Sequence, residues 1–181
     1  MSTRQANLTQ CFLEQARHSL QRHHLPRITS CLQTLSETDI WWRPNSAANS
    51  VGNVVLHLEG NVRQWIISGL GGEPDRRDRP REFAERGPIP RPKLISGLRS
   101  AVTKATRVLQ EVPARGLERF YTIQGFRVSG ITAIQHVLEH FAYHAGQIVY
   151  VTKLKHRKDL GFTRLPGEKP KDRKQRRLPA I

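Results

Sequence analysis

The sequence predicts an all-α protein, and more narrowly a four-helix bundle. Apolar residues recur at spacings of three and four in four stretches of the chain, which is the pattern of helices that bury one face. Turn-forming residues separate these stretches, and the sequence contains no internal repeat. With 181 residues, one bundle domain over residues 1–160 and a tail over residues 161–181 are expected. The four predicted helices are 5–35, 50–70, 92–110 and 129–155.

The first predicted helix, residues 5–35, contains Pro26 in its middle. A proline inside a helix removes one backbone hydrogen bond, so a kink or a split is expected there. Residues 36–39 then break the helical pattern. An apolar plug follows at residues 40–42, and a loop at residues 43–49 leads to the second helix.

The second predicted helix has clear signals at both ends. Ser50, or Asn49 one residue earlier, is a good N-cap, because its side-chain oxygen can accept from a free backbone N–H of the first turn. Glycines at 69, 71 and 72 end the helix. Residues 73–90 are rich in Arg, Asp, Pro and Gly and are predicted to form a long loop, a feature that often borders a functional site.

The remaining elements lead to the last helix. Pro92 opens the third predicted helix, and Pro113 and Gly116 follow its end. Residues 117–128 hold β-forming residues around Gln124-Gly125, which is compatible with a short hairpin or with an extended connection. The last helix, residues 129–155, carries three of the eight histidines.

Charge and cysteine content bound the functions to consider. The net charge is +15, and residues 153–181 hold eleven Lys or Arg and three acidic residues, a net of +8. The tail is therefore predicted to be disordered, and weak electrostatic binding of nucleic acid through it is one expectation. Cys11 and Cys31 would lie about 30 Å apart on one helix, too far for a disulfide. With no apolar run long enough to cross a membrane, a cytoplasmic protein is expected.

The histidines of the last helix point to a metal site. His140 and His144 are four residues apart, so their imidazoles face the same way on a helix and can share one ion. His57, at the edge of the apolar stripe of the second helix, is the best third ligand. The alternatives are a polar helix edge with coincidental spacing, or a site that uses His136 with His140.

Two motifs, together with a tryptophan-containing turn, resemble a known family. Residues 50–58 (SVGNVVLHL) and 140–148 (HFAYHAGQI) are similar to motifs of the DinB-like superfamily of four-helix-bundle proteins. Trp42–Asn45 and residues 64–72 narrow the resemblance to a bacterial subfamily of unknown function. The resemblance covers roughly residues 5–155. It implies a divalent metal ion, held by His57, His140 and His144.

The resemblance also implies a range of chemistry. Relatives include thiol-dependent enzymes that use bacillithiol, mycothiol or glutathione, and many are homodimers. The common Arg-Gly-Gln after the second histidine of the pair is Ala145-Gly146-Gln147 here, which removes a charge near the site.

The resulting hypothesis is a metal-dependent thiol S-transferase or hydrolase that acts on a small molecule with a low-molecular-weight thiol. The expected ion is Zn²⁺ or Ni²⁺, with Fe²⁺ as a further candidate, because imidazole suits all three. The alternatives are a non-enzymatic bundle with a structural metal ion and a nucleic-acid-associated protein. The residues expected to orient the imidazoles or a ligand are Asn53, Asn61 and Gln147.

Overall fold

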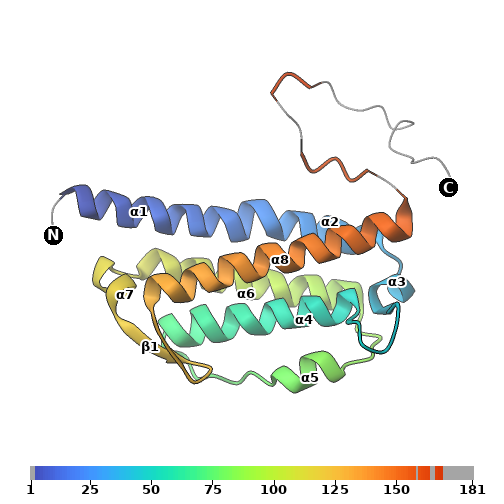
Figure 1. Ribbon diagram of the computed structural model, residues 1–181, viewed down its shortest axis with the longest axis horizontal. Helices are drawn as coiled ribbons and strands as arrows, with labels where there is room; N and C mark the ends of the chain where they lie inside the picture. The colour runs from blue at the N-terminus through green and yellow to red at the C-terminus, as the bar shows by residue number, and fades with distance from the viewer. Residues whose placement is uncertain (1–2, 158, 164–165, 169–181) are drawn as a thin grey trace.

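Four long helical segments lie side by side along the molecule, and a short hairpin and short helices connect them (Figure 1). The structure is a computed structural model that describes residues 3–157, 159–163 and 166–168. Because the four long segments are helical, the all-α bundle predicted from the sequence is confirmed. The predicted disorder of the tail concerns residues that lie largely outside the described ones, but Phe162 is described, and its carbonyl accepts from Arg27 Nη2 at 3.0 Å.

The first segment contains a wide helical turn ahead of its proline. Helix α1 (Thr3–His18) continues through a π-helix, η1 (Ser19–His24), into α2 (Leu25–Thr34). Pro26 lies in the first turn of α2, and the N–H of Leu25 bonds to the carbonyl of Leu20, five residues back. The predicted interruption at Pro26 therefore takes the form of a π-helical turn, which adapts the backbone to the missing N–H.

The second segment begins where the sequence predicts. After α3 (Glu37–Trp41), α4 (Val51–Val62) starts with Ser50 as its N-cap and continues into a second π-helix, η2 (Arg63–Leu70). Ser50 Oγ accepts from the N–H of Asn53 at 3.1 Å, and Asn53 Oδ1 accepts from the N–H of Ser50 at 3.2 Å. This reciprocal capping box satisfies two donors that the first turn would otherwise leave free.

The direction of the third segment explains the long connection after η2. Helix α6 (Arg91–Glu111) runs in the same direction as α4, so residues 71–90 must return along the bundle before α6 can begin (Figure 1). This crossover is not wholly irregular, because it contains a short helix, α5 (Arg79–Ala84). Asp78 caps α5 by accepting from the N–H of Arg81 at 3.1 Å, and Pro80 lies in its first turn.

A short helix and a hairpin reverse the chain before the last segment. Helix α7 (Ala114–Glu118) precedes the antiparallel strands β1 (Phe120–Ile123) and β2 (Phe126–Ser129). Between the strands, Gln124 and Gly125 have φ values of 54° and 80°, the left-handed pair that a tight two-residue hairpin turn requires. The hairpin alternative is thus the observed one, and Ser129 caps α8 (Gly130–His156).

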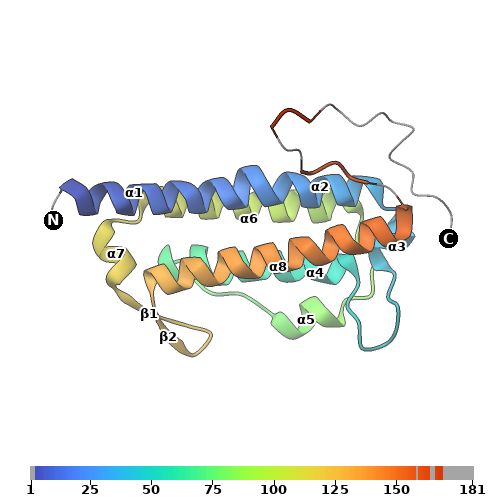
Figure 2. The same cartoon turned by 45° about the horizontal axis from the view of Figure 1, so that its top comes forward.

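The core lies between the four long segments. Helix α2 contacts α6 and α8, and α4 also contacts α6 and α8, so α1–α2 and α4 occupy opposite corners of the bundle (Figure 2). Each segment contributes apolar side chains that are fully or almost fully buried. None of the described helices has both the length and the apolar character needed to cross a membrane. Representative core residues are Leu32, Leu58, Leu98 and Phe141.

A half-buried histidine links the stability of the bundle to pH. The ring of His24 lies 6.0 Å from that of Phe141, measured between ring centroids. Burial, followed by the neighbouring charges of His23 and Arg27, lowers the pKa of His24 from its ordinary 6.5 to about 4. The unfolded chain therefore binds a proton at His24 in a pH range where the folded chain does not.

We expect the free energy of unfolding of the metal-free protein to fall as the pH drops from 6.5 toward 4, and to be insensitive to His24 above that range. Urea unfolding followed by circular dichroism at about pH 7 and about pH 5 measures this loss. His24→Leu removes the titrating group. The variant should therefore lose less free energy of unfolding between the two pH values than the wild type does. An equal loss in both proteins would contradict the assignment.

Candidate metal centre

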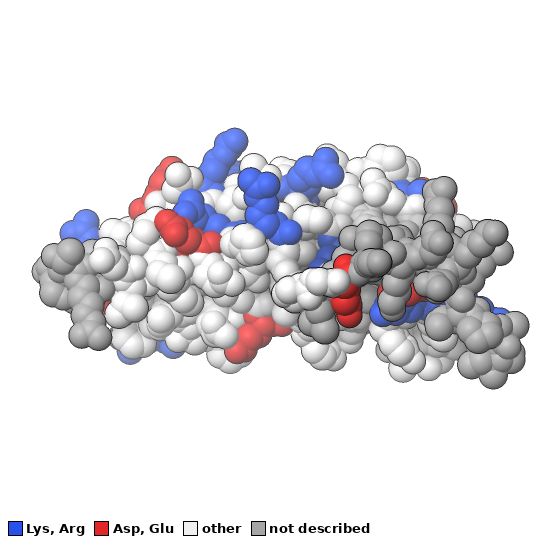
Figure 3. Space-filling view, turned by 90° about the horizontal axis from the view of Figure 1, so that it is seen from above, with Lys and Arg blue, Asp and Glu red and all other residues white. Residues whose placement is uncertain are grey.

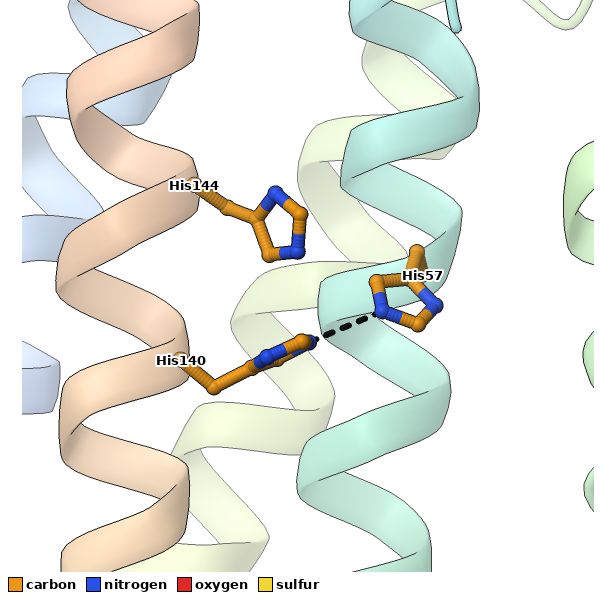
Figure 4. A group of neighbouring side chains, drawn as sticks. All are labelled: His57, His140 and His144. Carbon is orange, nitrogen blue, oxygen red and sulfur yellow. Dashed lines mark hydrogen bonds between the residues drawn. The ribbon is translucent and has the colours of Figure 1, made fainter.

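Three imidazoles from two antiparallel helices meet at one point between α4 and α8 (Figure 4). His57 comes from the middle of α4, and His140 and His144 come from successive turns of α8. One nitrogen from each ring lies within 4.8 Å of the other two, and Nε2 of His57 is 2.8 Å from Nε2 of His140. The structure thus brings together the three side chains that the sequence singled out.

The three rings also have orientations that leave a common space. The ring centroids of His140 and His144 are 4.4 Å apart, and that of His57 is 4.8 Å and 5.2 Å from them. All three pairs are edge-on or strongly tilted, so the rings do not stack on one another. His57 is buried and the other two are half-buried, which leaves the cluster accessible from the α8 side.

A carboxylate from the crossover holds the far side of the His57 ring. His57 Nδ1 lies 2.9 Å from Glu82 Oε2, and an ionised carboxylate can only accept. Nδ1 therefore carries the proton, which leaves the lone pair of Nε2 directed toward α8. Arg77 Nη2 is also 3.0 Å from Nδ1, but a protonated Nδ1 cannot accept, so this is a close approach rather than a hydrogen bond.

Arg77 in turn holds Glu82 with a two-point contact. Its Nε donates to Glu82 Oε1 at 2.7 Å and its Nη2 donates to Oε2 at 2.9 Å, while its side chain is only 2% exposed. Nη1 of Arg77 donates to Gln64 Oε1 at 2.9 Å, and Gln64 Nε2 donates to Asp75 Oδ2 at 2.7 Å. A continuous polar chain therefore runs from the crossover through η2 to the ring of His57.

The charge state of Glu82 follows from these contacts. Burial alone would raise the pKa of Glu82, but hydrogen bonds from His57 and Arg77 outweigh burial and hold that pKa below its ordinary value. Glu82 is therefore ionised at neutral pH. Its negative charge favours the tautomer of His57 that keeps Nε2 free.

Gly60 makes room for this carboxylate. A Cβ at position 60 would collide with Glu82 Oε1 and come within 2.9 Å of Arg77 Nε, so only glycine allows the pair to lie against α4. Glu82 and Arg77 lie in the stretch that the sequence predicts as a long loop bordering a site, but neither was expected to act on His57. Two signals pointed to them: the capping pattern of Asp78 and Pro80 ahead of Glu82, and a glycine three residues after His57 on the same helix face.

Asn53 acts on the crossover rather than on an imidazole. Its Nδ2 donates to the carbonyls of Glu82 and Glu85 at 2.8 and 2.9 Å, and its Oδ1 accepts from Arg43 at 2.7 Å. The side chain was expected to orient an imidazole or a ligand, because it lies one turn before His57. Instead it fixes the backbone on both sides of Phe83, and so it positions the residue that holds His57.

Gln147 contacts a ring of the cluster. Its Oε1 lies 2.7 Å from Nδ1 of His144, and an amide oxygen accepts, so Nδ1 donates and Nε2 of His144 is left free. Asn61 instead approaches His136, with Nδ2 3.3 Å from its Nε2. The ring of His136 also lies 4.0 Å from that of Trp65, tilted by 32°, and stacks on that of His140 at 5.4 Å between centroids, but His136 is not one of the three histidines whose nitrogens converge.

The electrostatics of the cluster keep the two imidazoles of α8 neutral. Burial, followed by the proximity of His144, His57 and His136, lowers the pKa of His140 to about 3. Burial also lowers the pKa of His144, although the bond to Gln147 opposes this. A divalent ion requires neutral imidazoles, and three nitrogen donors leave at least one coordination position for water or a substrate. The donor set therefore fits a metal ion.

Comparisons with known proteins agree with this architecture. The model of a family described as "protein of unknown function (DUF1572)" matches residues 7–169. A solved DinB-like protein of Bacillus subtilis is 16% identical, with a TM-score of 0.61 over 81% of this chain and 95% of its own. A DinB-like protein of Bacillus cereus is 17% identical, with a TM-score of 0.58 over 74% of this chain and 87% of its own. No curated protein matches the sequence.

The two solved structures are too distant in sequence to show more than the fold, but the family model spans nearly the whole bundle. The chain therefore belongs to the DUF1572 family of unknown function and has the DinB-like fold.

Proposed function

We propose that the protein binds one divalent metal ion through His57, His140 and His144 and uses it for thiol S-transfer or hydrolysis on a small molecule. The observation that supports this most directly is the convergence of three imidazole nitrogens within 4.8 Å of one another, from helices that meet only in the folded chain. A polar helix edge would not bring a third ring from α4 to the pair on α8. The bond from His57 to Glu82 strengthens the argument, because metal-binding histidines commonly donate their second nitrogen to a carboxylate.

The donor set narrows the choice of ion. Three neutral imidazoles without a carboxylate or thiolate donor suit Zn²⁺ or Ni²⁺, and also Fe²⁺, rather than Mg²⁺ or Ca²⁺, which prefer oxygen. We favour Zn²⁺ or Ni²⁺. When bound, such an ion supplies Lewis acidity, which lowers the pKa of water or of a thiol at its open position.

The protein's own groups have separate roles in this proposal. Glu82 and Gln147 accept hydrogen bonds from the Nδ1–H groups of His57 and His144, so the Nε2 atoms of these two rings stay free as ligands. Phe83, whose ring centroid is 4.7 Å from that of His57, and Tyr143, 5.1 Å from His144, flank the cluster. Both would contact a substrate and limit the access of water.

The other expectations remain predictions. A cytoplasmic location, a homodimer and a low-molecular-weight thiol as co-substrate rest on the sequence and on the resemblance to the superfamily. Binding of nucleic acid through residues 161–181 rests on charge alone, and most of that segment lies outside the described residues.

The histidine cluster predicts a metal content that depends on particular rings. Protein isolated without chelator should contain close to one equivalent of a divalent transition metal by mass spectrometry. His144→Ala should lose most of it, because two imidazoles bind far more weakly than three. His136→Ala is the matched control on the same helix and should retain the metal. Loss in His136→Ala with retention in His144→Ala would place the site elsewhere on α8.

The contact between Glu82 of the crossover and His57 leads to a second prediction, which concerns the affinity for the metal ion. Glu82→Gln keeps the shape of the side chain but removes the charge that selects the tautomer of His57, so metal affinity should fall by about 10- to 100-fold. Gly60→Ala should act in the same direction by displacing Glu82, whereas Gly146→Ala is a control, since a Cβ there meets nothing within 4 Å. Competition with a coloured chelator measures all three. Unchanged affinity in Glu82→Gln would contradict its role.

The catalytic part of the proposal has its own test. The metal-loaded protein is incubated with bacillithiol, mycothiol or glutathione and a panel of electrophiles, and with ester and amide substrates, while thiol loss and product are followed. We expect turnover that requires the metal and is abolished in His144→Ala. A loaded, folded protein without turnover on any of these substrates would leave a metal-stabilised bundle and contradict the enzymatic proposal.

A further inference from the structure

A basic groove lies on the side of the bundle opposite the histidine cluster. It runs between α6 and the end of α1 with η1, and its volume is about 450 Å³. Figure 3, which looks down on α1 and α2, shows Lys and Arg side chains gathered toward one long edge of that face. The groove is lined by Arg17, Arg22 and Arg107, together with Gln21, Gln110 and Thr103.

Within the part of the chain that the structure describes, the three arginines of the groove have no acidic partners. Among the described residues, none of Arg17, Arg22 and Arg107 forms an ion pair, whereas Arg77, Arg63 and Arg91 elsewhere in the bundle are paired with glutamates. Glu14 is the one acid among the described residues that line the groove, and its carboxylate accepts from Gln10 at 2.7 Å. The groove therefore keeps a local excess of positive charge that an anion would neutralise.

Arg17 provides a second, independent observation. Its Nε is buried and has no hydrogen-bond partner among the described residues. A buried donor without a partner is costly, and charged donors cost more than neutral ones, so a bound anion or an ordered water would account for this one. The π-helix η1 begins two residues later, and π-helical turns occur often at functional sites.

We propose that this groove binds a small anion that carries one or more phosphate groups. Guanidinium groups bind phosphate oxygens in pairs, and the neighbouring amides and hydroxyl of Gln21, Gln110 and Thr103 can donate to the remaining oxygens. Among the described residues that line the groove, none is Phe, Tyr or Trp, and His18 supplies the one ring, so the groove offers little stacking surface for the bases of a nucleic acid. The proposal is independent of the metal centre.

The test is calorimetric titration of the full chain with inorganic tripolyphosphate at low and moderate salt. Because the basic C-terminal segment can bind the same anion, the difference between variants is the readout. Arg22→Gln and Arg107→Gln should each weaken one binding event by about tenfold, the usual effect of losing a charge-assisted contact. Arg17→Lys keeps the charge but loses the Nε donor, and should weaken the same event. Arg99→Gln, the control, removes an exposed charge from α6 outside the groove lining and should change affinity less than twofold.

Three results would overturn the proposal. The first is identical binding in the wild type, Arg22→Gln and Arg107→Gln, which would assign all binding to other cations. The second is an equal loss in Arg99→Gln, which would indicate a diffuse field rather than a site. The third concerns a single-stranded 12-mer: if it binds more tightly than tripolyphosphate and depends on Arg22 and Arg107, the ligand is a nucleic-acid backbone.

Discussion

The hydrogen bond between His57 Nδ1 and Glu82 Oε2, 2.9 Å long, joins the two parts of the molecule on which the candidate site depends. On one side it ties the crossover to α4. On the other it decides which nitrogen of His57 is free, and that nitrogen faces the pair on α8. Without this bond the ring could donate from Nε2, and that nitrogen would no longer be free to bind an ion shared with the α8 histidines.

The topology of the bundle makes this bond available. Since α4 and α6 run in the same direction, the chain between them must return along the bundle, and it passes His57 on the way. Asn53 and Gln64 hydrogen-bond to the crossover at the level of His57, and Gly60 leaves space for it there. Burying Arg77 and Glu82 has a desolvation cost that their mutual contacts offset only while both are present, and removing one partner of such a pair costs about 3–5 kcal/mol. The stability of the fold thus depends in part on the same Arg77–Glu82 contacts that position His57.

Local patterns predicted much of this structure, and the parts that they missed have physical reasons. The helix start at Ser50 follows from capping chemistry, and Gln124-Gly125 marked either a hairpin or an extended connection, of which the structure has the hairpin. The pairing of His57 with the α8 histidines could be anticipated because each lies at the edge of an apolar stripe. Glu82 and Arg77 could not, because their positions depend on the path of a crossover that has no hydrophobic period.

The central claim is that three imidazoles, and no cysteine sulfur, bind the metal ion. X-ray absorption of the zinc-loaded full chain tests it most directly, since imidazole rings give characteristic multiple scattering. We predict nitrogen or oxygen neighbours only, at about 2.0–2.1 Å, with a contribution from three imidazoles. Sulfur at about 2.3 Å, or a contribution from a single imidazole, would contradict the account.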